Sequence, residues 1–459
     1  MDNQYDFQSH QHFFFVGIAG TGMSAIAQYL KGVGKKVSGS DRLFGKENKM
    51  LIQKQFEKQG IQCFFQDASG LTPDVDVLVV STAIEESNVE YQKALSLNIP
   101  IIKRSELLAS ISRTKRTIAV GGTSGKSTTT AMIFHVLEEC GFSPSIMSGA
   151  GLTSLQEKGL PGNAWVGKSD WLVIEADESD GSIVNYTSEV ALLLNMDRDH
   201  KDYNELEELF KTFRSHTTKR FIVNQSHPRT KALSVNKDYD FGVEADCGFN
   251  GENFCQSGFS ISFECNGRKV DIPVIGRHNM ENALAAIACC SAVGADMASI
   301  IKALSSYRGI YRRTQLTGKK NGVYVIDDFA HNPAEVVCAI RACQSVGRRV
   351  FAWFQPHGFG PLKFMHAELE SEVLQPLRPD DKFILSDVYY AGGTVSREVT
   401  SADVAEKMKA DSAQVEYFPD RKELIPYLKG NVTDGDVVLI MGARDTTLSD
   451  FAAEILKSL

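Results

Sequence analysis

A glycine-rich turn that carries a lysine and several hydroxyl side chains is the sharpest chemical signal in the sequence. Its members are Gly122, Thr123, Ser124, Gly125, Lys126, Ser127 and Thr128. An apolar run precedes the turn and a helix-like stretch follows it, so backbone N–H groups and a helix N-terminus can surround phosphate oxygens there. Lys126 can reach the β- and γ-phosphates, and the Ser127 hydroxyl can bind Mg²⁺. We therefore expect a nucleoside triphosphate site, although Val120 stands where a strict phosphate loop has its first glycine.

A second glycine turn, at residues 17–24, follows another apolar run. Its spacing, G-x-x-G-x-G, differs from the G-x-G-x-x-G of dinucleotide-binding proteins, so NAD is poorly matched. Backbone N–H groups at the start of the next helix can still bind a diphosphate. Asp41, at the end of the following expected strand, can accept hydrogen bonds from a ribose or a base.

Acidic and histidine side chains follow the later apolar runs. Glu175 opens the acidic run at residues 175–180, and His200 ends a polar run that starts at Asn195. The carboxyl ends of parallel strands are where open α/β sheets bind ligands. A carboxylate there suits Mg²⁺, whereas His200 suits an acid, a base or a phosphate contact better than a magnesium ligand. Further along, Asp327, Asp328 and His331 follow a strand in the same way, with Arg313 just upstream; paired acids of this kind also serve as helix caps.

The elements that position these residues form three α/β blocks, each an alternation of apolar strands and helix-period segments. We expect an α/β protein of three domains, each with a mostly parallel sheet. Residues 1–112 form a Rossmann-like domain, residues 113–313 a phosphate-loop domain, and residues 314–459 a second Rossmann-like domain. Around Asn266 and Gly267 the pattern predicts a hairpin that adds an antiparallel edge to the central sheet.

Composition excludes several classes of protein. The chain has 49 Lys and Arg against 57 Asp and Glu, a net charge of −8, which disfavours nucleic acid as a partner. Hydrophobic residues make up 43%, and no apolar run is long enough for a membrane span. The 9 cysteines lack any C-x-x-C pair, which indicates reduced core thiols and a cytoplasmic protein.

Ordered motifs along nearly the whole chain resemble those of the Mur ligases of peptidoglycan synthesis. They are GIAGTGMSAIA at 17–27, SGSD at 38–41, STAI at 81–84, GTSGKSTT at 122–129, EADESD at 175–180, DH at 199–200, GRHNMENALAAIA at 276–288, RRTQ at 312–315 and DDFAHNP at 327–333. The resemblance implies a UDP-binding domain, a central ATPase domain and a C-terminal domain that binds the incoming amino acid or peptide.

The resemblance also implies roles for individual residues. The UDP-sugar would be bound by Gly20, Thr21, Gly22, Met23, Ser24, Ser40, Asp41, Ser81 and Thr82. ATP would be bound by the phosphate loop at residues 122–128, with Asn279 and Asn282 near adenine and Asp327 near the ribose. Ser127, Glu175 and His200 would form the Mg²⁺ sites, and Lys126 and Arg313 would contact the transferring phosphoryl group.

The implied reaction is an amide-forming ligation. ATP phosphorylates the carboxylate of UDP-N-acetylmuramate, and the amine of L-alanine or of a peptide attacks the acyl phosphate. Lys126, Arg313 and Mg²⁺ would neutralise charge, and His331 is the candidate that positions or deprotonates the amine. The partners are then small molecules, without nucleic acid or membrane, and the protein is a monomer or a homodimer.

The identity of the acceptor stays open at the level of sequence. At residues 357–363 the family usually has two arginines suited to an amino-acid carboxylate, and this chain lacks them. A ligase that joins UDP-N-acetylmuramate to a whole tripeptide is the nearest alternative to an alanine-adding enzyme. A UDP-sugar-binding regulator without turnover is another alternative. The presence together of four residues argues against it: Lys126, Glu175, His200 and Arg313. A simple phosphate-loop kinase would leave the first domain unexplained.

Overall fold

The computed structural model describes residues 5–45, 47–197, 201–390 and 397–459. The chain divides into two compact units. Unit 1 comprises Met1–Glu252, Glu264–Val270 and Glu281–Ile310, and unit 2 comprises Asn253–Phe263, Asp271–Met280 and Tyr311–Leu459. Two of the parallel sheets lie in unit 1, so the expected domain boundary near residue 112 stays a prediction.

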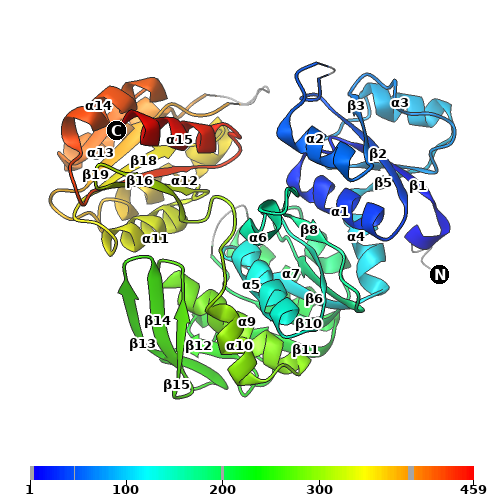
Figure 1. Ribbon diagram of the computed structural model, residues 1–459, viewed down its shortest axis with the longest axis horizontal. Coiled ribbons are helices and arrows are strands. Elements are labelled where there is room, and N and C mark those ends of the chain that lie inside the picture. Colours follow the sequence, from blue (N-terminus) through cyan, green and yellow to red (C-terminus); the bar gives the residue numbers. More distant parts are fainter. Residues whose placement is uncertain (1–4, 46, 198–200, 391–396) are drawn as a thin grey trace. The chain divides into compact units, whose positions relative to one another are not determined.

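The first sheet of unit 1 has the order β3-β2-β1-β4-β5 and all of its pairs are parallel. It lies in the N-terminal part of the chain, drawn in blue and light blue in Figure 1. Its strands are β1 (His12–Val16), β2 (Lys36–Asp41), β3 (Gln62–Phe65), β4 (Val77–Val80) and β5 (Ile101–Lys103). The helices of this part are α1 (Thr21–Gly32), α2 (Leu51–Lys58), α3 (Val89–Ser96) and α4 (Arg104–Arg113). The strand order reverses direction at β1, so the turn at residues 17–20 lies at the switch point where doubly wound sheets bind ligands.

The second sheet of unit 1 has the order β11-β10-β6-β9-β7-β8. Its strands are β6 (Arg116–Gly121), β7 (Ser145–Met147), β8 (Ala164–Trp165), β9 (Trp171–Glu175), β10 (Ser188–Leu193) and β11 (Thr217–Val223). The helices are α5 (Lys126–Glu139), α6 (Thr153–Gln156), α7 (Tyr203–Ser215), α8 (Pro228–Lys231), α9 (His278–Val293) and α10 (Met297–Leu304). Of α9, the residues from Glu281 onward belong to unit 1. The pairs are parallel except β7 with β8. The buried central strands β6 and β9 therefore end on one edge of the sheet.

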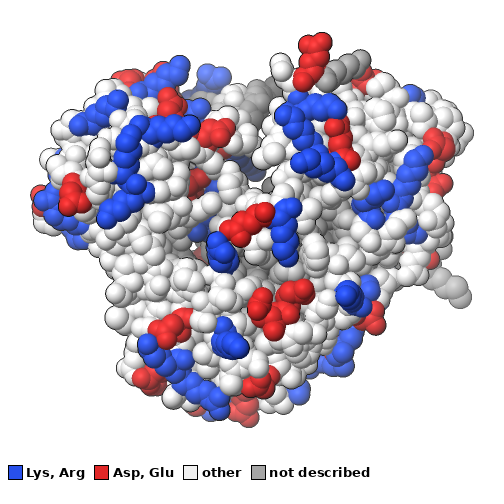
Figure 2. Space-filling view, viewed as in Figure 1, with Lys and Arg blue, Asp and Glu red and all other residues white. Residues whose placement is uncertain are grey.

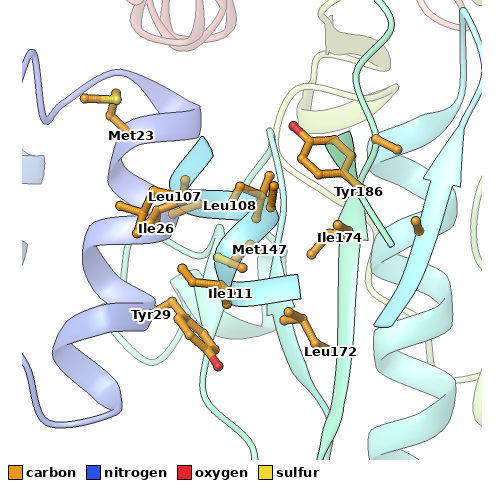
Figure 3. Close-up of a cluster of buried hydrophobic side chains, with 14 of the residues drawn as sticks. Met23, Ile26, Tyr29, Leu107, Leu108, Ile111, Met147, Leu172, Ile174 and Tyr186 are labelled. Carbon is orange, nitrogen blue, oxygen red and sulfur yellow. The ribbon is translucent and has the colours of Figure 1, made fainter. Parts of the chain in front are cut away.

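A continuous hydrophobic core joins the two sheets of unit 1 (Figure 3). Met23, Ile26 and Tyr29 recur along one face of α1 and are buried, as helical periodicity requires of a core-facing side. Figure 3 shows Ile26 and Tyr29, together with the labelled side chains of α4, on the side of α1 nearer to Met147 of β7 and Leu172 of β9. Each such side chain contributes about 1.5–3 kcal/mol when fully buried, so the two glycine turns are carried by one packed body.

The hairpin predicted around Asn266 and Gly267 is present, and both residues have positive φ, 50° and 73°, as a two-residue primed turn needs. It lies in a separate four-stranded sheet of order β12-β13-β14-β15, not on the edge of the central parallel sheet. The strands are β12 (Phe241–Val243), β13 (Phe249–Ser257), β14 (Ser260–Cys265) and β15 (Arg268–Ile272). The long strand β13 provides a pairing edge of its own, which is why the hairpin forms no edge of the central sheet.

The sheet of unit 2 has the order β16-β17-β21-β18-β19-β20, parallel except for β16 with β17. The strands are β16 (Gln315–Lys320), β17 (Val323–Asp328), β18 (Val350–Gln355), β19 (Lys382–Ser386), β20 (Val415–Phe418) and β21 (Val437–Gly442). The helices are α11 (Pro333–Gln344), α12 (Phe359–Glu372), α13 (Ser401–Asp411), α14 (Leu424–Asn431) and α15 (Leu448–Ser458). Two hydrophobic clusters share the sheet's strands, one with α11, α12 and α13 and the other with α14 and α15, so this is a doubly wound α/β layer.

Within the described part of the chain, no helix is both long and apolar enough to cross a membrane. Lysine and arginine side chains are interspersed with aspartate and glutamate over the face drawn in Figure 2. A mixed surface of this kind lacks the basic stripe typical of nucleic-acid-binding proteins on that face.

Candidate functional site

The predicted phosphate loop has the strand–turn–helix geometry that its chemistry needs. It leaves β6 at Gly121 and enters α5 with Gly125 as the N-cap, and no side chain caps that N-terminus. Gly122 and Gly125 have φ of 137° and 82°, values that favour glycine. A Cβ at Gly125 would also lie 2.6 Å from Oδ1 of Asn282. Because these glycines have no side chain, the backbone of the loop can approach a phosphate more closely than it could with other residues there.

Lys126 is held at the mouth of this loop by a carboxylate and a carbonyl. Its Nζ lies 2.9 Å from Oε2 of Glu178 and donates to the carbonyl of Gly122 at 2.7 Å. Burial alone would lower the pKa of Lys126, but Glu178 and Asp177 together raise it above its ordinary value. Burial raises the pKa of Glu178 against the opposing effect of the Lys126 charge. Lys126 is therefore a fixed cation.

Glu175, at the end of β9, accepts three hydrogen bonds beside the loop. Ser127 Oγ donates to its Oε2 at 3.0 Å, and Ser148 Oγ and the Gly149 amide donate to its Oε1 at 2.6 Å each. A hydroxyl and a carboxylate are the hard oxygen donors that Mg²⁺ prefers, so this pair fits the ion. His200 lies outside the described residues, and within those residues no group of three or more His, Cys, Asp or Glu side chains is arranged to hold a metal.

Asn195 is a site residue that the sequence interpretation left without a role. It follows β10, and its Oδ1 accepts from Thr123 Oγ1 at 2.9 Å and from the Ser124 amide at 2.8 Å. Its Nδ2 donates to the carbonyl of Ser124 at 3.0 Å. The oxygen and the nitrogen of the Asn195 side chain thus both form hydrogen bonds to the phosphate loop and hold its conformation. Its position after a parallel strand beside β6 was the signal that could have identified it.

The two asparagines expected near adenine lie on α9, one helical turn apart. Asn282 Oδ1 accepts from Thr129 Oγ1 of α5 at 3.2 Å, so Asn282 is beside the phosphate-loop helix. Asn279 Nδ2 donates to the carbonyl of Ile275 at 2.8 Å. Both are buried, at 4% and 7% exposure for Asn279 and Asn282.

The first glycine turn is braced by the residues proposed for the UDP-sugar. The Asp41 carboxylate accepts from the amides of Ala19 and Leu43 at 3.1 and 3.0 Å, so here it shapes the turn. Ser40 Oγ donates to Oε2 of the buried Glu90 at 2.5 Å. Burial raises the pKa of Glu90 to about 7, although the bond from Ser40 opposes this.

The remaining residues of that set have different surroundings. Gly20 caps α1, with Thr21 and Gly22 exposed or nearly so in its first turn, and Ser81 and Thr82 follow β4. Met23 is buried in the hydrophobic core and Ser24 is 1% exposed. The structure thus collects these residues at neighbouring strand ends, with Met23 acting in packing.

In unit 2, Arg313 and His331 converge on Glu335, which the sequence interpretation did not name. His331 Nδ1 lies 3.0 Å from Glu335 Oε2, and Arg313 Nη1 lies 3.6 Å from Oε1. Burial opposes ionisation of Glu335, yet His331 and Arg313 hold its pKa well below the usual range. The carboxylate therefore orients both side chains. The His357 ring lies 5.3 Å from the His331 ring between centroids.

Asp327, expected at a ribose, is bound to protein groups. Arg312 Nε donates to its Oδ1 at 2.9 Å and Ser449 Oγ donates to its Oδ2 at 2.6 Å. Only 2% of Asp327 is exposed. Its neighbour Asp328 has a pKa raised by burial to about 6, against the charge of Arg313.

Family models match three successive parts of the chain. The one described as Mur ligase family, catalytic domain, matches residues 12–116, the Mur ligase middle domain matches residues 120–290, and the Mur ligase, glutamate ligase domain, matches residues 312–444.

Curated relatives are similar over nearly the whole chain. The UDP-N-acetylmuramate–L-alanine ligase of Geobacter sp. (strain M21) is 35% identical over 446 residues, covering 94% of both chains. The protein of the same name from Acetivibrio thermocellus is 33% identical over 454 residues, covering 95% of this chain and 94% of its own.

Solved structures share the fold. A UDP-N-acetylmuramate-alanine ligase from Thermotoga maritima has a TM-score of 0.81 and 26% identity, covering 98% of this chain and 100% of its own. A murein peptide ligase from Psychrobacter arcticus has a TM-score of 0.68 at 21% identity, covering 98% of each chain, and is similar in fold.

Proposed function

This chain belongs to the Mur ligase family, and on that premise we propose that it joins the carboxylate of UDP-N-acetylmuramate to the amine of L-alanine with ATP. The observation that carries the proposal is the Ser127–Glu175 hydrogen bond of 3.0 Å beside a phosphate loop bearing Lys126. A nucleotide site with a metal-suited carboxylate is what an acyl phosphate mechanism needs. The reaction belongs where ATP is, in the cytoplasm.

In the first step, two anions must meet: the muramoyl carboxylate and the γ-phosphate. Lys126 and the amides of the phosphate loop hold the phosphates, and Asn195 holds the loop in shape. Ser127 and Glu175 would hold Mg²⁺, which supplies further charge neutralisation. Because the transition state of phosphoryl transfer spreads negative charge over oxygens, fixed cations and donors lower its energy most.

The UDP-sugar belongs at the first glycine turn. The amides at the start of α1 point away from the helix and favour a diphosphate. The turn lies at the switch point between β1 and β4. Because these two strands are parallel neighbours, their carboxyl ends, and with them Ser81 and Thr82, lie at the same edge of the sheet. The sugar is thereby bound in the same packed unit as the phosphate loop.

For the second step, His331 takes the proton from the attacking amine. Glu335 orients its imidazole from 3.0 Å and stabilises the cation that forms, as a carboxylate does for a general base in other enzymes. Arg313, which pairs with the same carboxylate, would contact the transferring phosphoryl group. The amine adds to the acyl phosphate, phosphate leaves, and an amide remains.

The test is incubation of the protein with ATP, Mg²⁺ and UDP-N-acetylmuramate, with L-alanine, L-serine, glycine or L-alanyl-γ-D-glutamyl-diaminopimelate in parallel reactions. Phosphate release and product mass are measured. We expect ligation of L-alanine. Ligation of the tripeptide alone would make the protein a recycling ligase, and ATP binding without product would make it a regulator. The same preparation in a sizing column decides between the two predicted states, a monomer and a homodimer.

A further inference from the structure

A buried asparagine that directly precedes β8, Asn163, is hydrogen-bonded to the first turn of α1. Asn163 Nδ2 donates to Ser24 Oγ at 2.7 Å and to the carbonyl of Thr21 at 2.9 Å. Its Oδ1 accepts from Gln28 Nε2 at 2.8 Å. Asn163 is 6% exposed. The side-chain amide of Asn163 therefore makes all three of these hydrogen bonds to one helix, α1, which begins at the first glycine turn.

The backbone of Asn163 continues the connection to the ATP site. Its carbonyl accepts from the Ser148 amide at 2.9 Å. Ser148 Oγ then donates to Glu175 at 2.6 Å, and Glu175 accepts from Ser127 at 3.0 Å. A chain of direct hydrogen bonds thus runs from the start of α1 to the phosphate loop.

Packing makes this connection stiff. At the other end of α1, a Cβ on Gly32 would lie 2.5 Å from Cγ2 of Val166, so α1 approaches the segment after β8 closely. Between these two points α1 contributes Ile26 and Tyr29 to the core shown in Figure 3. The helix is therefore fixed at both ends and along its length.

We infer that Asn163 is a positioning residue, which sets the UDP-sugar turn at a fixed place relative to Glu175 and the phosphate loop. This inference rests on the proposed function, in which a carboxylate carried by one site must meet a phosphate held at the other. Misplacement of reacting groups by about 1 Å can cost about 100-fold in rate. An apolar residue at 163 would pack but would leave the Ser24 hydroxyl and the Thr21 carbonyl without these donors.

The variant that tests the inference is Asn163→Leu, which keeps the number and branching of the side-chain heavy atoms and removes the polar contacts. Thr117→Val is the matched control, because Thr117 is 1% exposed and donates to the Ser112 carbonyl at 2.8 Å at the opposite end of β6. We expect Asn163→Leu to lower kcat at least about 10-fold, while the dissociation constants of UDP and of MgADP, each measured alone, change less than about 3-fold. Thr117→Val should lose comparable thermal stability and keep kcat.

A second readout does not depend on turnover. Amide hydrogen exchange is followed with and without MgADP: the wild type should gain protection at residues 20–24 as well as in the phosphate loop, and Asn163→Leu only in the loop. An unchanged kcat in Asn163→Leu, or protection that spreads equally in both proteins or in neither, would overturn the inference. A wild-type protein that forms no product would instead refute the proposed function, and the exchange pattern would still decide the role of Asn163.

Discussion

Lys126 and Glu178 form an ion pair of 2.9 Å at the mouth of the phosphate loop, with side chains 16% and 4% exposed. The lysine that would contact ATP is therefore held in place before nucleotide binds. Glu178 belongs to the acidic run after β9, so the same segment that supplies Glu175 beside the loop also holds the loop's cation. The segment at the end of β9 thus supplies the Glu175 carboxylate of the nucleotide site and also fixes the position of its cation, Lys126.

Replacing Lys126 with methionine separates catalysis from stability. We expect Lys126→Met to lower ATP-dependent phosphate release at least about 100-fold and to leave UDP binding unchanged. The buried Glu178 would lose its partner, which costs about 1–3 kcal/mol of unfolding free energy. That cost should grow as the pH rises, because the carboxyl must then ionise without a cation. Urea unfolding at two pH values measures it. The double variant Lys126→Met/Glu178→Gln should regain stability without activity; recovery of activity would contradict the assignment.

Glu175 should govern the dependence on Mg²⁺. Glu175→Gln keeps an oxygen that can accept from Ser148 and the Gly149 amide, so the fold should persist, but it removes the negative charge that suits a hard cation. We expect the Mg²⁺ concentration for half-maximal rate to rise at least about 10-fold. Asp180→Asn, at the half-buried ion pair with Arg104, is the control and should titrate like the wild type. An unaltered Mg²⁺ titration of Glu175→Gln would remove Glu175 from the site.

The buried Glu90 makes stability fall as the pH rises. Its pKa is raised by burial from 4.5 to about 7, so between these values the folded state keeps a proton that the unfolded state has lost. The associated stabilisation is complete below about pH 4.5 and is lost as the pH rises through about 7. The full effect on the free energy of unfolding is on the order of 3 kcal/mol. Asp41 and Asp67 face the same carboxyl and add to the shift.

Glu90→Gln removes this titration and retains an oxygen for the Ser40 hydroxyl. Its unfolding free energy relative to the wild type should therefore increase between pH 5 and pH 8. Glu86→Gln changes an exposed acid close by and serves as the control. A difference between Glu90→Gln and wild type that stays constant over that range would show that Glu90 is ionised throughout.

His331 should act in the second step and not in the first. We expect His331→Ala to lower amide formation about 100-fold while the protein still forms the acyl phosphate. Hydroxylamine traps an acyl phosphate as a hydroxamate, so hydroxamate formed from ATP and UDP-N-acetylmuramate measures the first step alone. Glu335→Gln should cause a smaller loss of the same kind. If hydroxamate and amide fall together, His331 belongs to phosphoryl transfer.

The fold was largely predictable because its central strands are buried on both faces. β1, β6, β9 and β21 are continuous apolar runs, as parallel strands under helices must be. β16 could not be predicted: its residues, QLTGKK, are mostly polar and none is buried, and only pairing with β17 makes them a strand. The separate sheet that contains the hairpin likewise depends on tertiary pairing of β13.

The site shows the same division. The phosphate loop and the acids after strands carry local signals of type and spacing, and Lys126, Ser127 and Glu175 do lie together. Asn163 and Glu335 carry no such signal. The role of Asn163 comes from contacts with α1, which is distant in sequence, and the role of Glu335 comes from its ion pairs with Arg313 and His331. Asp41 was assigned to a ribose or a base from its place at a strand end, and Asp327 to the ribose by resemblance. The Asp41 carboxylate accepts from the Ala19 amide and the Asp327 carboxylate accepts from Arg312, and both ligand roles stay predictions.

The most direct test of the central claim follows oxygen from the muramoyl carboxylate. UDP-N-acetylmuramate labelled with oxygen-18 in that carboxylate is incubated with the protein, ATP, Mg²⁺ and L-alanine, and the released phosphate is analysed by mass. Activation as an acyl phosphate predicts that a labelled oxygen leaves with the phosphate as the amide forms. Amide formation with unlabelled phosphate, or phosphate release that is the same without UDP-N-acetylmuramate, would contradict the account.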